Sequence, residues 1–116
     1  MRLRLEYYDH NEHFARVLPV DGTVARRVQS TAGDEWVLFQ LDAPASYENV
    51  SYEYFLLRSR WRNVEIGGKE PTSVFVLLVT DQKEARNGFD VHSFTHAAWG
   101  MARTLQRVRL KLPTPV

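Results

Sequence analysis

Residues 73–80 read SVFVLLVT, and this run decides the fold class of the chain. In an extended backbone successive side chains point to opposite faces, and both faces are apolar here. The side chains on the two faces are Val74, Val76 and Leu78, and Phe75, Leu77 and Val79. Such a strand fits the middle of a sheet that is covered on both sides.

Further strands are predicted around this run because apolar and polar residues alternate there with a period of two. They are residues 2–8, 13–20, 23–30, 35–42, 50–62 and 107–112. Asp21-Gly22 between two of these runs predicts a hairpin turn, since glycine tolerates a positive φ. Pro44 predicts a loop over residues 43–49, and Gly67-Gly68 predicts a further turn.

The pattern changes after residue 80. Asp81 and Asp90 are both candidate helix N-caps, and Glu84 lies three residues after the first. We therefore expect one or two short helical segments around residues 82–102, the second of them reaching Met101. With this exception the chain is predicted to be mainly β, as a small antiparallel barrel or sandwich of six to eight strands.

Size and composition fit one globular domain. The chain has 116 residues, of which 44% are hydrophobic and 25% charged. We expect a single β-rich domain over residues 1–112, followed by a frayed tail over 113–116. The absence of cysteine excludes disulfides and cysteine-ligated zinc. With no apolar run long enough to span a bilayer and no secretory signal, a cytoplasmic protein without membrane contact is expected.

The net charge of +1 argues against a general attraction to polyanions. The charge is unevenly spread, because residues 1–57 hold 5 Lys/Arg against 9 Asp/Glu while residues 58–116 hold 10 against 5. This split predicts a surface of two signs. Alternatively, strands from both halves interleave in the fold and their fields cancel.

Residues 52–62 form the most informative segment for function. As a strand, they put Phe55, Leu57, Ser59 and Trp61 on the core side. The other side runs from aromatic to cationic, and its predicted ligand-binding residues are Tyr52, Tyr54, Arg58, Arg60 and Arg62. Tyrosine rings stack on apolar groups and arginine forks match carboxylates or phosphates. Alternatively, the tyrosines cover a second small core and the arginines pair with Glu6, Glu35 or Glu53.

A protein partner or a second copy of the chain is favoured over nucleic acid. Arg107, Arg109 and Lys111 would extend the cationic face if the C-terminal strand lay beside residues 50–62. However, no RNP-like pattern, helix-turn-helix or zinc finger supports nucleic-acid binding.

Trp99 and Met101 are candidate interface residues, because tryptophan and methionine are common in the centres of interfaces. They motivate the hypothesis that the chain is a structural subunit of a larger assembly. Alternatively, Trp99 fills the mouth of the barrel as part of the core.

Four histidines are the only candidates for a metal site: His92, His96, His10 and His13. His92 and His96 are four residues apart, which on a helix would place both rings on one face. This pattern lacks the glutamate of a metalloprotease motif, and histidine pairs at this spacing also arise by chance. No cofactor is expected.

No catalytic motif is present, since the chain has neither a nucleophile elbow nor a phosphate-binding glycine loop. The favoured function is a non-enzymatic binding or interaction module for an anionic partner or a protein. The alternatives are a small metal-dependent enzyme or ligand-pocket protein, and the assembly subunit.

Overall fold

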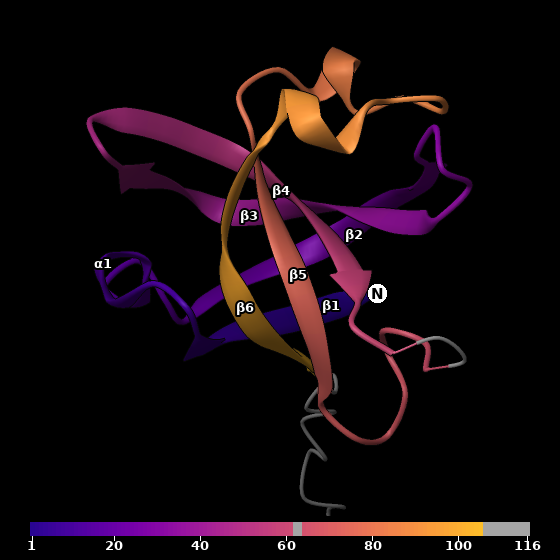
Figure 1. The fold of residues 1–116 in the computed structure, drawn as a ribbon. Helices are drawn as coiled ribbons and strands as arrows, with labels where there is room; N and C mark the ends of the chain where they lie inside the picture. Colours follow the sequence, from indigo (N-terminus) through magenta and orange to yellow (C-terminus); the bar gives the residue numbers. More distant parts are fainter. Residues whose placement is uncertain (62–63, 106–116) are drawn as a thin grey trace, which may run out of the picture.

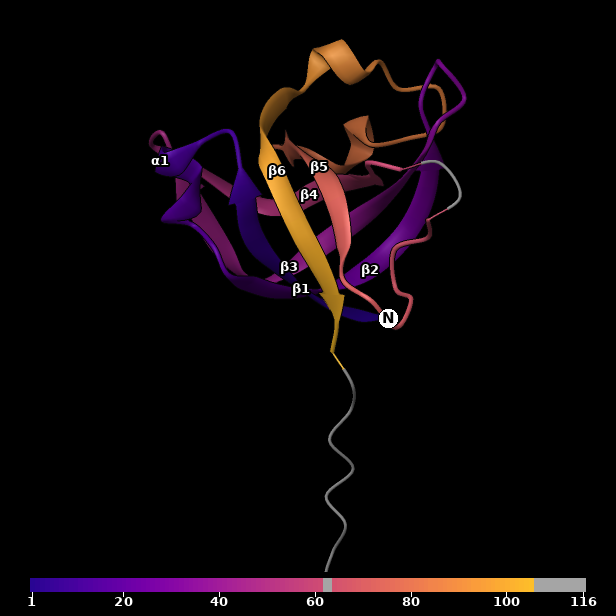
Figure 2. The same cartoon turned by 60° about the horizontal axis from the view of Figure 1, so that its bottom comes forward.

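Six strands close into one antiparallel barrel in this computed structural model, which describes residues 1–61 and 64–105 (Figures 1 and 2). Each strand pairs with its neighbour in the sequence, and β6 pairs back onto β1. The strands are β1 Arg2–Asp9, β2 Val20–Gln29, β3 Glu35–Tyr47, β4 Val50–Ser59, β5 Thr72–Val79 and β6 Thr95–Thr104. The prediction of a mainly β antiparallel fold is confirmed, with a barrel as its form.

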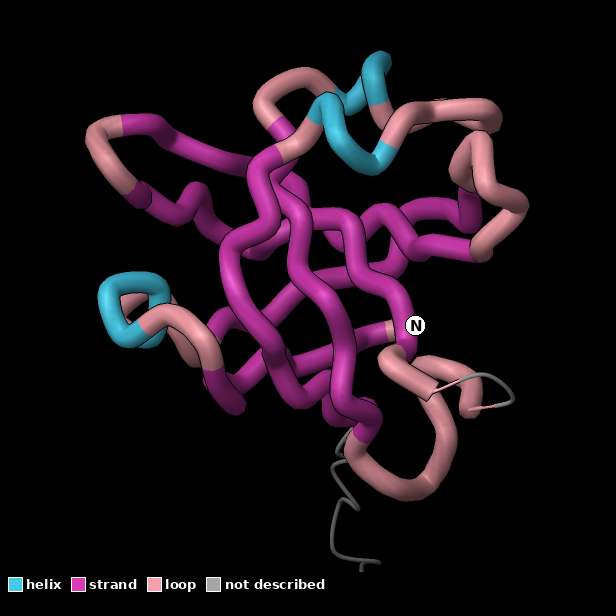
Figure 3. Tube along the Cα trace, viewed as in Figure 1, coloured by secondary structure: helices cyan, strands magenta, loops and turns pink. Residues whose placement is uncertain are grey.

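Three short helical segments lie in the connections between strands (Figure 3). They are α1 Glu12–Ala15 and the 3₁₀ turns η1 Gln82–Glu84 and η2 Val91–Ser93. Asp81 and Asp90 cap the two turns as predicted, since their carboxylates accept hydrogen bonds from the backbone N–H of Lys83 and His92. No helix within the described ranges is both long enough and apolar enough to cross a lipid bilayer.

The interior of the barrel is filled by one apolar cluster to which strands all around the barrel contribute. Its largest fully buried side chains include Leu3, Leu5, Phe14, Phe39, Phe55, Leu57, Val74 and Val76. The interior is thus a packed core. Phe14 comes from α1 and packs against Tyr47 and Phe55, so this short helix closes one end of the barrel.

A second apolar cluster lies on the outer face of β2–β5. It consists of Val28, Trp36, Leu38, Leu56, Leu77, Val79, Ala85 and Phe89. Ala85 and Phe89 belong to the segment between β5 and β6, which covers this part of the barrel wall (Figure 1, orange). The two-sided burial expected for residues 73–80 is therefore confirmed.

The predicted strand over residues 13–20 and the hairpin turn at Asp21-Gly22 are wrong. The side-chain oxygen of Asn11 accepts hydrogen bonds from the backbone N–H groups of His13 and Phe14, and this cap starts α1. Gly22 lies inside β2, where a Cβ atom would come within 2.2 Å of the Gln40 carbonyl oxygen. Glycine is used here for close strand approach and not for a turn.

The predicted loop over residues 43–49 is also wrong. β3 continues through Pro44 to Tyr47, and the turn is formed by Glu48 and Asn49, whose φ values are 49° and 64°. Between Gln40 and Ala45 the pairing with β4 is interrupted by a bulge. Proline is compatible with such an irregular position at the edge of a sheet.

The second helical segment is much shorter than predicted, because η2 ends at Ser93 and β6 begins at Thr95. Gly100 lets β6 approach β1 closely, since a Cβ atom there would come within 2.6 Å of Leu5 Cδ1. Barrel closure therefore overrides the weak helical pattern of residues 94–101. The strand predicted over 107–112, the tail over 113–116 and residue Arg62 lie outside the described residues.

Candidate functional site

Aromatic and cationic side chains from four neighbouring strands gather on the outer face of the barrel. Arg58 on β4 pairs in register with Phe75 on β5, and Phe75 pairs with Trp99 on β6. The group, which we call the Trp–Arg surface, consists of Trp36, Arg58, Arg60, Trp61, Phe75 and Trp99. The regular pleat places the strand residues Trp36, Arg58, Phe75 and Trp99 outside the barrel because the opposite positions fill its core. Arg60 and Trp61 follow directly after the end of β4.

Arg58 is held tightly within the Trp–Arg surface. Its guanidinium lies 5.5 Å from the ring centre of Trp36 and 4.5 Å from that of Phe75. Its Nη1 atom also lies 3.3 Å from a carboxylate oxygen of Asp34. The Nε atom is buried and has no hydrogen-bond partner among the described residues. Arg58 therefore fixes the arrangement of its neighbours, with its charge largely matched within the protein.

Arg60 is held differently, because two tryptophans flank it. Its guanidinium lies 4.5 Å from the ring centre of Trp99 and 5.0 Å from that of Trp61. The backbone N–H of Arg60 donates to the carbonyl of Ser73, which ties the residue to β5. In the part of the chain that the structure describes, Arg60 forms no ion pair. Stacking on ring faces leaves the N–H donors at the guanidinium edge free for a carboxylate.

A cleft of about 400 Å³ adjoins these arginines. Its charged lining residues are three arginines and three carboxylates: Arg27, Arg58, Arg60, Asp34, Glu35 and Glu65. Its apolar lining includes Val64, Ile66 and Trp61, and 58% of the Trp61 surface is exposed. The site thus combines mixed charge with an exposed aromatic ring.

The predicted ligand-binding residues lie in three different environments. Tyr52 is 8% exposed and packs in the barrel core, so its prediction as a surface residue beside Tyr54 is wrong. The bulge in β3 changes the pairing opposite this part of β4, and Tyr52 turns inward. Burial raises the pKa of the Tyr52 hydroxyl above its ordinary value.

Tyr54 is half-buried against the outer apolar cluster, which agrees with the alternative that it covers a second core. Arg58 pairs with Asp34 and not with any of the three glutamates considered from the sequence. Arg60 remains the predicted cation that is most available at this surface.

Trp61 is misplaced by the sequence prediction, which put it on the core side of the strand. β4 ends at Ser59, whose hydroxyl accepts a hydrogen bond from the Trp61 backbone N–H and donates to its carbonyl. This local turn takes the chain out of the pleat, so the ring points away from the core. The only sequence signal for this turn is Ser59 itself, because a serine hydroxyl can bond to the backbone two residues further on and so compete with strand pairing.

Trp99 and Met101 both lie on the partly exposed outer face of β6. Trp99 stacks on Phe75 at a centroid distance of 3.9 Å and does not fill the barrel mouth. Their role as interface residues stays a prediction.

Within the described residues, the four histidines do not come together as the metal site that was considered from the sequence. His92 belongs to η2 and His96 to β6, so the two rings are not on one helix. His10 and His96 instead flank Trp99, at centroid distances of 5.6 and 6.1 Å. Over the ranges that the structure describes, no three histidine or acidic side chains are grouped to hold a metal ion. Partial burial, with a smaller effect of nearby His10, lowers the pKa of His96.

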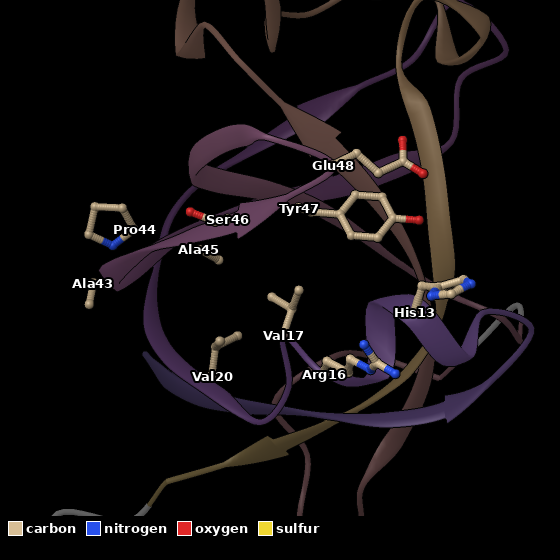
Figure 4. A pocket seen from close by; sticks show the side chains of 10 residues that line it. All are labelled: His13, Arg16, Val17, Val20, Ala43, Pro44, Ala45, Ser46, Tyr47 and Glu48. Carbon is tan, nitrogen blue, oxygen red and sulfur yellow. The ribbon is translucent and has the colours of Figure 1, made fainter.

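A second cleft, of about 670 Å³, opens at the end of the barrel that α1 closes (Figure 4). One wall carries His13, Arg16, Val17 and Val20, and the other is the outer part of β3 from Ala43 to Tyr47 with Glu48 beyond it. Sequence reasoning missed this cleft, because it assigned one wall to a strand and the other to a loop.

Comparisons with family models, curated proteins and solved structures found no match to this chain.

Proposed function

We propose that this domain is a non-enzymatic interaction module that binds an acidic segment of a partner protein through the Trp–Arg surface. The observation that carries the proposal is Arg60, whose guanidinium is held between Trp61 and Trp99 and forms no ion pair in the described part of the chain. A side chain immobilised in this way loses little further entropy when it binds, which favours affinity.

A carboxylate is the ligand group that best suits this site. The planar guanidinium can donate two parallel hydrogen bonds to a carboxylate while its faces remain on the tryptophan rings. Trp61 offers an exposed ring at the same place, and tryptophan and arginine are the residues that most often dominate binding energy at protein interfaces.

The cleft beside Arg60 argues for a protein segment and against a nucleic acid. Asp34, Glu35 and Glu65 line it together with the arginines. These carboxylates would repel the continuous negative charge of a phosphate backbone. A protein segment can place one carboxylate on Arg60 and neutral or basic groups beside the acidic residues.

Site-specific photo-crosslinking tests this proposal in cells that produce the protein. A photoreactive amino acid replaces Val64, which lines the cleft, or Tyr8, which is also exposed but is not among the lining residues. We expect a protein adduct from position 64 and none of the same mass from position 8. Adducts that are identical at both positions would contradict the proposal.

The acidic segment mapped in that adduct is then synthesised and titrated calorimetrically against variants. R60E should weaken binding at least about ten-fold, because it replaces the attracting charge with a repelling one. R60K, which keeps the charge but loses the fork, should give an intermediate loss. R86E is the matched control, because Arg86 is exposed in the segment between β5 and β6 and lines a different cleft. Equal affinity of R60E and the wild type would overturn the assignment.

A further inference from the structure

The cleft between α1 and β3 borders a sheet edge that has no neighbouring strand among the described residues. Pairing between β2 and β3 ends at Gly22 and Leu41, and beyond this point β3 continues while the chain before β2 turns away toward α1. Figure 4 shows the outer part of β3 on one side of the opening and Val17 and Val20 on the other. Within the described ranges, β3 is therefore paired only with β4 over its last residues.

The hairpin register identifies which backbone groups face this cleft. Glu48 and Asn49 form a two-residue turn with positive φ values, and Tyr47 and Val50 flank it as partners. In such a hairpin the flanking residues exchange both backbone hydrogen bonds. Hydrogen-bonded and non-hydrogen-bonded pairs alternate along an antiparallel ladder. The next pair, Ser46 and Ser51, is consequently non-hydrogen-bonded, and the N–H and C=O of Ser46 point toward the cleft.

We infer that this edge binds an extended peptide segment of a partner protein, which adds as a strand beside residues 44–47 of β3. A peptide residue opposite Ser46 would accept from its N–H and donate to its C=O, and the Pro44 carbonyl offers a further acceptor. Main-chain pairing of this kind provides affinity, while pockets for alternate side chains provide selectivity. The inference does not depend on the Trp–Arg surface, because the two sites share no lining residue.

The lining of the cleft specifies the chemistry of the peptide. Val17, Val20 and the buried Ala45 provide an apolar floor for a small aliphatic side chain. Arg16 on the helix side is exposed and has no ion pair among the described residues, whereas Glu48 lies across the opening at the tip of the hairpin. Charge complementarity therefore favours an aliphatic residue between an acidic residue near Arg16 and a basic residue near Glu48.

Four extended residues span about 13 Å, which matches the stretch of β3 from residue 44 to residue 47. In the described part of the chain, the outer part of β4 is also unpaired on its far side, since pairing with β5 begins only at Tyr54. That edge does not line the cleft, however, so only the β3 edge offers walls for side chains. Ser51 thus provides a matched control for Ser46 within the same hairpin.

A displayed library of random octapeptides, selected on the wild type alone, tests the inference, and the enriched peptides are then measured on the S46P and S51P variants. S46P removes the N–H that faces the cleft, and S51P removes the equivalent N–H on the opposite edge. We expect enriched peptides that carry the acidic–aliphatic–basic pattern. They should bind the wild type, S51P and R60E with equal affinity, and S46P at least about ten-fold more weakly.

Two further measurements separate loss of the edge from loss of the fold. R16E leaves the backbone intact and should weaken the same peptides several-fold. In the wild type, the peptide should slow hydrogen exchange of the Ser46 amide, and a peptide N-methylated on its pairing edge should not. Failure to enrich any peptide, or equal binding to S46P, would overturn the inference. So would self-association of the chain that S46P abolishes, since the occupant would then be a second copy.

Discussion

His96 shows how a single residue can respond to the packing around it. Its ring lies 5.8 Å from that of Phe75 and 6.1 Å from that of Trp99, while one side remains exposed. Partial loss of hydration disfavours the charged imidazolium, and the pKa of His96 falls below its ordinary value. Packing against these aromatic rings therefore favours the neutral form of the His96 ring.

This environment predicts that acid destabilises the fold through His96. Because the pKa in the folded chain lies below the unfolded value of about 6.5, the unfolded chain binds a proton more readily. The stabilising contribution is present above that pH and is lost as pH falls through the folded pKa. We expect H96Q to lose less stability than the wild type between pH 7.5 and pH 5, measured by urea unfolding.

NMR titration provides a direct check on the cause. The pKa of His96 should lie below about 6.5 in the wild type. It should rise in H10Q, because the repulsion from His10 is removed. A His96 pKa that is unchanged in H10Q would contradict the proposed contribution of His10.

At the scale of the elements, two glycines decide how closely the strands approach. Gly22 faces the Gln40 carbonyl and the ring of Phe39 on β3, and Gly100 faces Leu5 on β1. Neither residue needs a positive φ, so their role is to leave space between neighbouring backbones. The pairings β2–β3 and β1–β6 both depend on this space.

G22A should consequently destabilise the barrel strongly. The new Cβ would meet backbone oxygen at 2.2 Å, which strand movement would have to relieve. Overpacking of this kind costs about 1–3 kcal/mol or more in the free energy of unfolding. G68A is the matched control, because its Cβ would meet the Glu65 carbonyl oxygen only at an ordinary contact distance of 3.9 Å. Urea denaturation of both variants should show a large loss for G22A only, and equal stabilities would contradict this account of β2.

For the whole molecule, closure depends on the pairing of the first and last described strands. β1 covers Arg2–Asp9 and β6 covers Thr95–Thr104, and their register joins Leu3 to Thr104 and Leu5 to Ala102. The pairing leaves no open sheet edge between the two strands, which otherwise would offer unpaired backbone groups to other chains. Leu3 and Leu5 also belong to the barrel core, so closure and core formation are coupled.

Deletion of residues 2–9 should therefore convert the closed barrel into an aggregating open sheet. The deletion exposes the edges of β2 and β6 and removes two fully buried leucines. Light scattering should show association of the deleted chain at concentrations where the full chain scatters as a single species. The full-length E6Q variant, which changes a charge on β1 without removing pairing, should behave as the full chain does.

The sequence by itself determined the strands β1 to β4 in outline, the burial of both faces of β5, and the caps at Asp81 and Asp90. These features depend on local alternation and on hydrogen bonds between near neighbours. Only the tertiary structure decided that Gly22 is a packing residue, that Tyr52 points inward and that Trp61 points outward. Each of these depends on a bulge, a strand end or a close approach between distant segments, and such contacts have no counterpart in the local pattern. The contact between the Arg60 guanidinium and the Trp99 ring depends in the same way on strands that meet only when the barrel closes. The free edge of β3 is likewise a result of how the strands pair in the barrel.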